Sequence, residues 1–268
     1  MAGDMPGSME PGRASRKEGG KTMSLLTAGY YYGGGYGGYP VYFDWTYLLA
    51  ILGLVLTMIA SARVNSTFAR YQRVRSMSGL TGAGAARRIL DSQGLENVAI
   101  EHISGNLTDH YDPRSRTLRL SDATYSSDSI AAICVAAHES GHAVQDKVHY
   151  GPLVLRSTLV PAAQFGSSLS WPVFIFGLIF SIQPLITAGI ILFCLAVVFQ
   201  LVTLPVEFDA SRRALKILSD SGMVSDQELQ GGRKVLWAAA MTYVAALASS
   251  ILQLLRLLIL ANNRRDRR

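Results

Sequence analysis

Long uncharged hydrophobic stretches alternate with one ordinary polar region along this chain. Residues 45–62 carry no charged side chain, and residues 157–206 contain no Asp, Glu, Lys or Arg. About 20 apolar residues in a helix cross the ~30 Å hydrocarbon core of a bilayer. The first stretch therefore predicts one transmembrane helix. The second predicts a transmembrane hairpin, with spans near 167–183 and 185–205 and a turn at Gln183-Pro184.

A fourth apolar stretch lies near the C-terminus. Residues 235–255 are uncharged and about one bilayer long, but Arg256 interrupts the apolar run before Ala261. A charged side chain inside the hydrocarbon is costly. The segment 235–261 is thus predicted to be either a fourth transmembrane helix or a helix packed on the others in the membrane. The basic tail 262–268 follows it.

The first 44 residues have neither helical nor strand periodicity. They are rich in Gly and Pro and include the run YYYGGGYGGYP at 30–40. Such a segment cannot bury enough apolar surface to offset the entropy of ordering. We expect residues 1–44 to be disordered.

The polar region 63–156 has the pattern of a small α+β domain. It begins with a basic helix beside the membrane, followed by a helix near 83–93 and a strand at 97–103. Two short β-type runs flank the turn Asp112-Pro113-Arg114-Ser115, which predicts a β-hairpin. A further helix is predicted to start at Ser127-Asp128 and to run to about Lys147.

Composition supports a membrane protein. Of the 268 residues, 49% are hydrophobic and only 16% are charged, against about 25% charged in soluble domains. The apolar content excludes a mainly disordered chain, and two cysteines exclude a disulfide scaffold. The basic residues gather beside apolar segments rather than along one helix face, which argues against nucleic acid as a partner. The expected fold is a mainly α membrane protein with about four transmembrane helices, and its expected surrounding is a lipid bilayer.

The distribution of Lys and Arg predicts the orientation. Cytoplasmic loops carry an excess of these residues. The segments 63–156 and 207–234 bear most of them near the span ends, which places the central domain in the cytoplasm and makes the chain a multi-pass plasma-membrane protein. The four arginines of the tail, on the other side if the last helix spans, run against this rule. The ten basic residues that set it are Arg63, Arg70, Arg73, Arg75, Arg156, Arg212, Arg213, Lys216, Arg233 and Lys234.

The helix predicted over 128–147 contains the pattern H-E-x-x-H at residues 138–142. His138 and His142 lie one turn apart on one helix face, so both imidazoles can reach a single zinc ion, and Glu139 can face its water. The alternative is a pair of core histidines bonded to the backbone. Because residues 130–137 are almost wholly apolar, burying these polar groups without a partner would cost several kcal/mol.

A catalytic zinc site needs a third protein ligand. The sequence offers His102, His110, His149 or an acid further along. We favour Glu207, because the predicted hairpin 157–206 returns the chain to the membrane face that bears the histidine helix. The alternative for Glu207 is an interfacial charge paired with Arg212 or Arg213.

Several segments resemble a known family. SARVNSTFARYQRVRS, SGLTGAGAARRIL, LTDHYDPRSRTLRLS, AAHESGHAVQ and LPVEFDASRRAL are similar to successive blocks of the neutral zinc metallopeptidase family of bacterial membranes, over about residues 45–260. The EFDAS block resembles the second motif of the heat-shock and prenyl-protein membrane metalloproteases, which implies Glu207 as third zinc ligand. Those relatives often carry Asp where this chain has Ser211, so Asp209 or another acid is expected to orient a ligand histidine.

These features predict an integral-membrane, zinc-dependent endopeptidase with a small zincin-like domain. Zinc would activate a water molecule, and Glu139 would take its proton and pass it to the leaving amine. The substrates would be proteins or peptides, membrane proteins among them. The hairpin 106–120 is either a plain structural element or an edge that pairs with the substrate. Within it, His110 or Tyr111 could donate a hydrogen bond to the tetrahedral oxyanion.

The sequence is also compatible with a second function and with two roles for the apolar segment 157–206. The alternative function is a non-catalytic membrane protein whose zinc is structural and serves a binding or scaffold role. Cys134, one turn before His138, is the local residue that could close such a site. The apolar segment 157–206 either anchors the domain or lines a substrate path with polar residues such as Gln164. The sequence does not indicate an oligomeric state.

Overall fold

The computed structural model describes residues 44–265. Nearly all of the segment predicted to be disordered, and the last three residues of the basic tail, lie outside this range. The described part has six helices and a three-stranded sheet. The helices are α1 (Tyr47–Gln72), α2 (Gly82–Ser92), α3 (Ile130–Lys147), α4 (Gly151–Ile179), α5 (Gln183–Asp220) and α6 (Asp226–Arg265), and the strands are β1 (Ala99–Ile103), β2 (His110–Asp112) and β3 (Thr117–Ser121).

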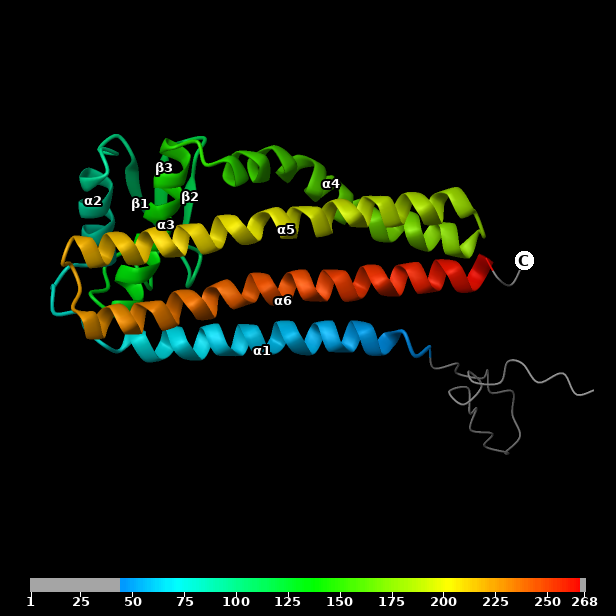
Figure 1. Ribbon diagram of the computed structural model, residues 1–268, viewed down its shortest axis with the longest axis horizontal. Coiled ribbons are helices and arrows are strands. Elements are labelled where there is room, and N and C mark those ends of the chain that lie inside the picture. Colours follow the sequence, from blue (N-terminus) through cyan, green and yellow to red (C-terminus); the bar gives the residue numbers. More distant parts are fainter. Residues whose placement is uncertain (1–43, 266–268) are drawn as a thin grey trace, which may run out of the picture. The chain divides into compact units, whose positions relative to one another are not determined.

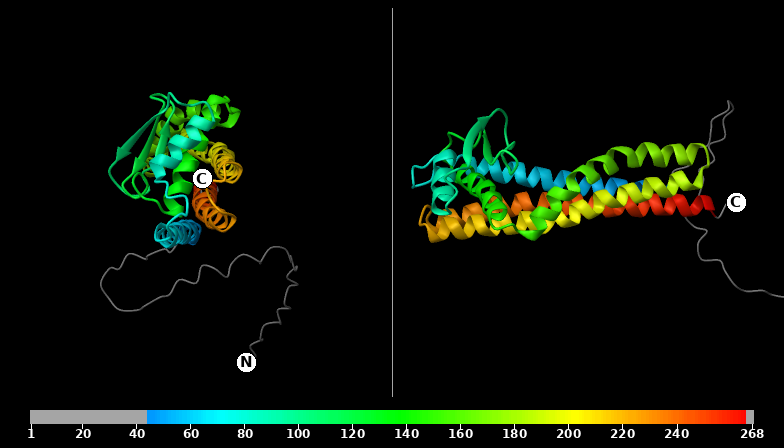
Figure 2. Two further views of the ribbon diagram at one scale, coloured as in Figure 1. Left: turned by 90° about the vertical axis from the view of Figure 1, so that its left-hand side faces the viewer. Right: turned by 90° about the horizontal axis from the view of Figure 1, so that it is seen from above.

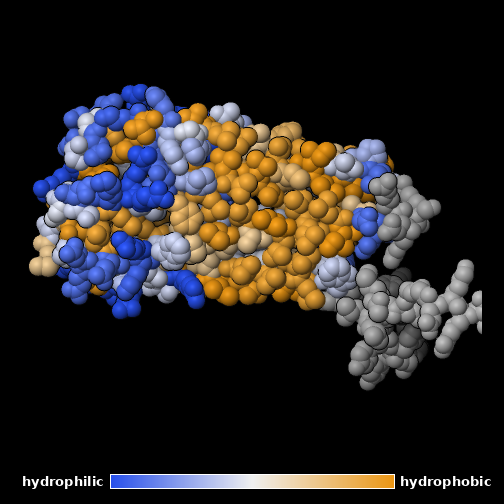
Figure 3. Space-filling view, in the orientation of Figure 1, coloured by the Kyte–Doolittle hydropathy of each residue, from blue (hydrophilic) through white to orange (hydrophobic). Residues whose placement is uncertain are grey.

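Four of these helices are long and apolar enough to cross a membrane: α1, α4, α5 and α6. They lie side by side, α4 against α5, α5 against α6, and α6 against α1 (Figures 1 and 2). Figure 3 shows a broad hydrophobic surface along these helices, with hydrophilic residues gathered at the end that carries α2, α3 and the sheet. This arrangement is consistent with a membrane protein and confirms a mainly helical fold.

The long helices extend further than the hydrophobic pattern alone predicted. α1 continues through the basic segment to Gln72, and α5 continues past Glu207 to Asp220. The connection between α4 and α5 lies at residues 180–182, where Ser181 has a φ of 56°. Gln183-Pro184 opens α5 instead of forming the turn, because proline in the first helical turn forfeits no hydrogen bond.

The C-terminal helix passes through Arg256 without a break. The guanidinium of Arg256 lies 4.3 Å from the centroid of the Tyr47 ring on α1. A cation placed over an aromatic face is attracted by the ring quadrupole. This contact explains how one charge is accommodated within an otherwise apolar helix pair.

The small sheet confirms the predicted strand and hairpin. The strand order is β1-β3-β2, with β1 parallel and β2 antiparallel to β3. β2 is therefore an edge strand whose inner neighbour is β3. The predicted helix near 83–93 is confirmed as α2. The zincin-like description of this end of the molecule stays a prediction.

The helix that carries the histidine motif is the buried centre of the polar end. Ile133 and Ala137 are fully buried, and α3 contacts α2, α5 and α6. Its N-cap is Ser129, whose side chain accepts a hydrogen bond from the Ala132 N–H at 3.2 Å. The predicted start at Ser127-Asp128 was two residues early, because the Asp128 carboxylate instead pairs with Arg75 at 2.6 Å.

Candidate metal centre

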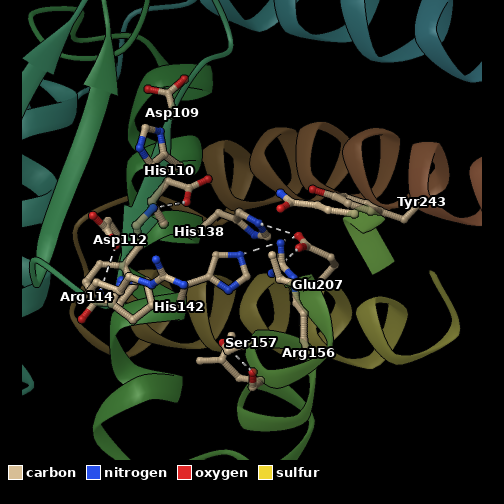
Figure 4. A pocket seen from close by; sticks show the side chains of 16 residues that line it. Asp109, His110, Asp112, Arg114, His138, His142, Arg156, Ser157, Glu207 and Tyr243 are labelled. Atoms are coloured by element: carbon tan, nitrogen blue, oxygen red, sulfur yellow. Dashed lines mark hydrogen bonds and ion pairs between the residues drawn. The ribbon is translucent and has the colours of Figure 1, made fainter. Parts of the chain in front are cut away.

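Three side chains that were predicted as metal ligands converge between α3 and α5 (Figure 4). The ligand atoms of His138, His142 and Glu207 all lie within 4.8 Å of one another. Glu207 Oε2 is 3.3 Å from His138 Nε2 and 3.6 Å from His142 Nε2. Glu207 is only 2% exposed. Two imidazole nitrogens and one carboxylate oxygen are the donor set of many catalytic zinc sites, which leave the fourth position to water or substrate.

A close approach of two helices brings Glu207 to the histidines. His138 and His142 share one face of α3 because they are four residues apart. Between them, Gly141 faces α5 so closely that a Cβ atom would lie 2.7 Å from the carbonyl oxygen of Ala210. Only glycine allows this backbone separation. Ala210 is one turn beyond Glu207 on α5, so the contact fixes the depth at which the carboxylate meets the imidazoles.

Polar side chains orient the histidine rings from behind. Gln145 is fully buried, and its Oε1 lies 3.0 Å from Nδ1 of His142. Its Nε2 donates to the Val206 carbonyl at 2.9 Å and to Asp209 at 2.8 Å. Asp209, which the sequence analysis named as a candidate to orient a histidine, thus reaches His142 only through Gln145.

Ser211, which stands where similar motifs often carry Asp, itself contacts a histidine of the cluster. The Ser211 hydroxyl lies 3.2 Å from Nδ1 of His138. A hydroxyl can accept the Nδ1–H hydrogen bond that keeps Nε2 free as a ligand atom. The neutral Ser211 hydroxyl oxygen therefore lies where the similar motifs often have a carboxylate.

Charges around the cluster are balanced by a cation from α4. The Arg156 guanidinium donates to Glu207 Oε1 at 3.2 Å. Burial lowers the pKa of His142, but the Glu207 and Glu139 carboxylates raise it, and the net pKa is raised. Two imidazoles and a guanidinium thus surround the Glu207 carboxylate, an arrangement that favours the charged form able to bind a cation.

Glu139 lies beside the cluster and faces the hairpin. It is 9% exposed, and its Oε2 accepts a hydrogen bond from the Tyr111 backbone N–H at 3.1 Å. The Tyr111 hydroxyl is turned away and donates to Asp146 at 3.0 Å. Burial, and next that hydrogen bond, raise the pKa of Tyr111. Only the main chain of Tyr111 thus reaches the glutamate, whereas exposed His110 lines the same cavity as His138.

The other candidate ligands lie elsewhere in the described structure. His102 pairs with Asp122 at 2.7 Å, and His149 follows the end of α3 in a left-handed conformation. Cys134 is buried against Gly232 in the core, and burial followed by the Glu228 charge raises the pKa of its thiol to about 12. Within residues 44–265, the group of His138, His142 and Glu207 is the one set of metal-type ligands found.

Two cavities meet at the cluster. One, of about 490 Å³, opens toward α4 and the hairpin, and another, of about 240 Å³, opens between α1 and α6. His138, Glu139, Glu207 and Tyr243 line both. The cluster is therefore reachable from two sides, which a purely structural metal site does not require.

The sequence did not predict that Gln145, Arg156 and Tyr243 belong to this site. Gln145 stands three residues after His142, a spacing that places both side chains on one helix face. This spacing could have indicated their contact from the sequence. The sequence identifies Arg156 only as one of the basic residues that predict the membrane orientation. Tyr243 lies within an apolar stretch, and its position beside Glu207 depends on the packing of α6 on α5, which no local pattern encodes.

Comparison with known proteins agrees with this centre. Residues 46–262 match a family model described as "Putative neutral zinc metallopeptidase". The chain is also 48% identical over 218 residues to a Bacillus subtilis (strain 168) protein described as "Putative membrane protease YugP", covering 81% of this chain and 97% of that protein. No solved structure matches. The chain belongs to this neutral zinc metallopeptidase family, and its histidine–glutamate cluster fits the metal in the family's description.

Proposed function

We propose that this protein is an integral-membrane, zinc-dependent endopeptidase. The observation that carries the proposal is the convergence of His138, His142 and Glu207 beside Glu139 in an accessible cavity. A structural site would be closed by a fourth protein ligand. Cys134, the local candidate for that role, points into the core instead.

His138, His142 and Glu207 would hold the zinc ion. When bound, zinc supplies a Lewis acid that polarises the scissile carbonyl and lowers the pKa of a water molecule. Glu139 would act as general base and then general acid: its carboxylate takes a proton from the attacking water and returns it to the leaving amine. The hydrogen bond from the Tyr111 N–H holds this carboxylate at the cavity wall.

Hydrogen-bond donors for the oxyanion are available on several sides of the cavity. His110, Arg156 and Tyr243 all line it. Figure 4 shows Arg156 and Tyr243 on either side of Glu207. Such a donor lowers the barrier when it stands about 3 Å from the developing oxyanion. Tyr111 does not qualify through its hydroxyl, because that group is bound to Asp146.

The substrate would bind as an extended peptide along β2. β2 pairs with β3 on its inner side, and the Tyr111 N–H, directed at Glu139, marks the side that faces the cavity. An edge strand can add an extended peptide through main-chain hydrogen bonds. Asp109, Asp112 and Arg114 line the same cavity and would meet the substrate's side chains.

The hydrophobic surface of the long helices supports the proposed membrane placement. α1, α4, α5 and α6 would span the plasma membrane, with the metal centre at their polar end. Arg63, Arg70 and Arg212 are exposed at that end. An excess of basic residues is typical of the cytoplasmic side of membrane proteins, which supports a metal centre that faces the cytoplasm.

The proposal is tested by incubating the detergent-purified chain with unfolded casein, beside Glu139→Gln, with a chelator added and zinc then restored. Cleavage should vanish with the chelator, return with zinc, and be absent in Glu139→Gln although that variant still binds zinc. Equal cleavage by Glu139→Gln would refute the role of Glu139. A wild type that binds zinc tightly but cleaves neither casein nor membrane-protein substrates would favour the structural or scaffold role.

A further inference from the structure

A groove on the outer side of α5 and α6 has no role in the proposed hydrolysis. It has a volume of about 500 Å³. Its walls repeat at one-turn spacing on both helices, with Phe208, Arg212, Lys216 and Asp220 on α5 and Leu229, Arg233 and Trp237 on α6. Because the two helices are antiparallel neighbours, these rows face each other across the groove.

One end of the groove is aromatic and the other end is positively charged. At the end nearer the apolar part of the helices, the rings of Phe208 and Trp237 meet edge to face, with centroids 6.0 Å apart, and Trp237 is 59% exposed. Arg212 and Arg233 follow one turn further toward the polar end, and Lys216 one turn beyond Arg212. Aromatic side chains followed by cations are the arrangement found where a helix pair crosses the headgroup layer.

The charge of the groove is not neutralised by the protein. Lys216 pairs with Asp220 at 2.6 Å, and Asp220 is the one acid that lines the groove. Within residues 44–265, no hydrogen bond or ion pair joins Arg212 or Arg233 to a carboxylate. By contrast, the neighbouring Arg213 is bound to Asp209 at 2.5 Å. In the described residues Arg212, which interacts with Asp209 through charge alone, and Arg233 thus line the groove without a direct bond to a carboxylate.

We propose that this groove binds the headgroup of an anionic glycerophospholipid. The phosphate would lie between Arg212 and Arg233, whose planar guanidinium groups match phosphate oxygens. The glycerol and the start of the acyl chains would lie over Phe208 and Trp237 and continue along the apolar helix surface. A soluble phosphate would use the two arginines but not the aromatic pair, so the lipid uses more of the groove.

The site would adjoin the metal centre without belonging to it. Ser211 lines the groove, and its hydroxyl also contacts His138 at 3.2 Å. A headgroup held between α5 and α6 would therefore lie one residue from the side chain that orients a ligand histidine. The binding of lipid itself is independent of peptide hydrolysis and is measured without substrate or metal.

Trp237 provides a direct probe. The chain has three tryptophans, so the full-length variant Trp45→Phe/Trp171→Phe reports from the groove alone. It is reconstituted in vesicles of unlabelled phosphatidylcholine that contain increasing fractions of brominated phosphatidylglycerol or of brominated phosphatidylcholine. Bromine quenches the nearby indole, which gives the relative binding constant of the two lipids at this site.

We expect phosphatidylglycerol to bind about tenfold to thirtyfold more tightly than phosphatidylcholine, since each cation near the headgroup layer contributes several-fold. Arg212→Gln/Arg233→Gln should reduce this preference to threefold or less. The matched control Arg63→Gln/Arg70→Gln removes two exposed cations of α1 outside the groove and should retain it. Lys216→Gln/Asp220→Asn should change it little, because it removes a paired cation and anion and leaves the net charge of the groove the same.

Three results would overturn the proposal. The first is equal binding of the two lipids by the otherwise wild-type protein. The second is an unchanged preference in Arg212→Gln/Arg233→Gln, which would assign the charge effect to the surface as a whole. The third is relief of quenching by inorganic phosphate at constant ionic strength, which would show that the groove takes a free anion rather than a lipid.

Discussion

Gly141→Ala tests whether the contact between α3 and α5 positions the metal centre. The added Cβ would lie 2.7 Å from the Ala210 carbonyl oxygen and 3.3 Å from its carbon. Backbone atoms cannot rotate away, so the helices must separate by roughly 0.5–1 Å. Overpacking of this kind destabilises by about 1–3 kcal/mol, which corresponds to a fall in Tm of about 3–10 °C for a chain of this size.

The same separation moves Glu207, one turn before Ala210, away from the histidines. Metal–ligand distances tolerate only about 0.2 Å, and a displacement approaching 1 Å can reduce a rate about a hundredfold. We expect Gly141→Ala to weaken zinc binding and to lower casein cleavage by about 10- to 100-fold, measured by competition with a zinc indicator and by product release.

Gly84→Ala is the matched control, because a Cβ at this helical position has only ordinary contacts, 3.4 Å to the Thr81 hydroxyl being the shortest. It should leave zinc binding unchanged and raise Tm slightly, since alanine is the better helix former. If Gly141→Ala kept wild-type zinc affinity and a Tm within 1 °C, the close approach of α3 and α5 would not be what positions Glu207.

Further variants probe the residues behind the cluster and the anchoring of α3. Gln145→Ala should weaken zinc binding about 10- to 100-fold, because it frees His142 from its buried partner; an unchanged affinity would refute the orienting role. Ser211→Asp should tighten zinc binding and Ser211→Ala weaken it, and identical affinities for both would show that this position does not act on the metal. The Asp128 pKa is lowered by its hydrogen bond to Arg75 and then by the opposite charge, so the pair stabilises above pH ~4 and loses this contribution as the pH falls through the lowered pKa. The Tm difference between wild type and Asp128→Asn should therefore be constant from pH 8 to 5 and shrink below pH 4; a difference that shrinks between pH 8 and 6 would contradict this.

Much of the architecture could be predicted from periodicity. The apolar stretches are long enough to be recognised as four helices, and the hairpin 106–120 has its turn residues in place. The ends of helices were harder to place. α5 continues past Glu207 because Ala210, Ala214 and Leu218 keep a buried apolar stripe at helical spacing. Arg212, Lys216 and Asp220 lie on an exposed face, and such an amphipathic continuation of an apolar helix leaves no break in the pattern.

The candidate site likewise has a part that the sequence predicts and a part that depends on the packing of helices. His138, Glu139 and His142 form a local motif, and Glu207 was favoured because the hairpin returns the chain to the same face. The surrounding contacts depend on packing between helices. Tyr243 reaches the cluster from α6, and the Tyr111 hydroxyl binds Asp146 rather than the site. No spacing along the chain encodes such contacts.

The measurement that tests the account most directly is the dependence of peptide cleavage on free zinc for the wild type, Glu207→Gln and the control Asp220→Asn at the end of the same helix. A single curve reports both metal binding and turnover. The wild type and the control should saturate at the same low free zinc, while Glu207→Gln should need at least a hundredfold more zinc or show no cleavage. Equal zinc dependence of Glu207→Gln and the wild type would contradict a zinc site built from His138, His142 and Glu207.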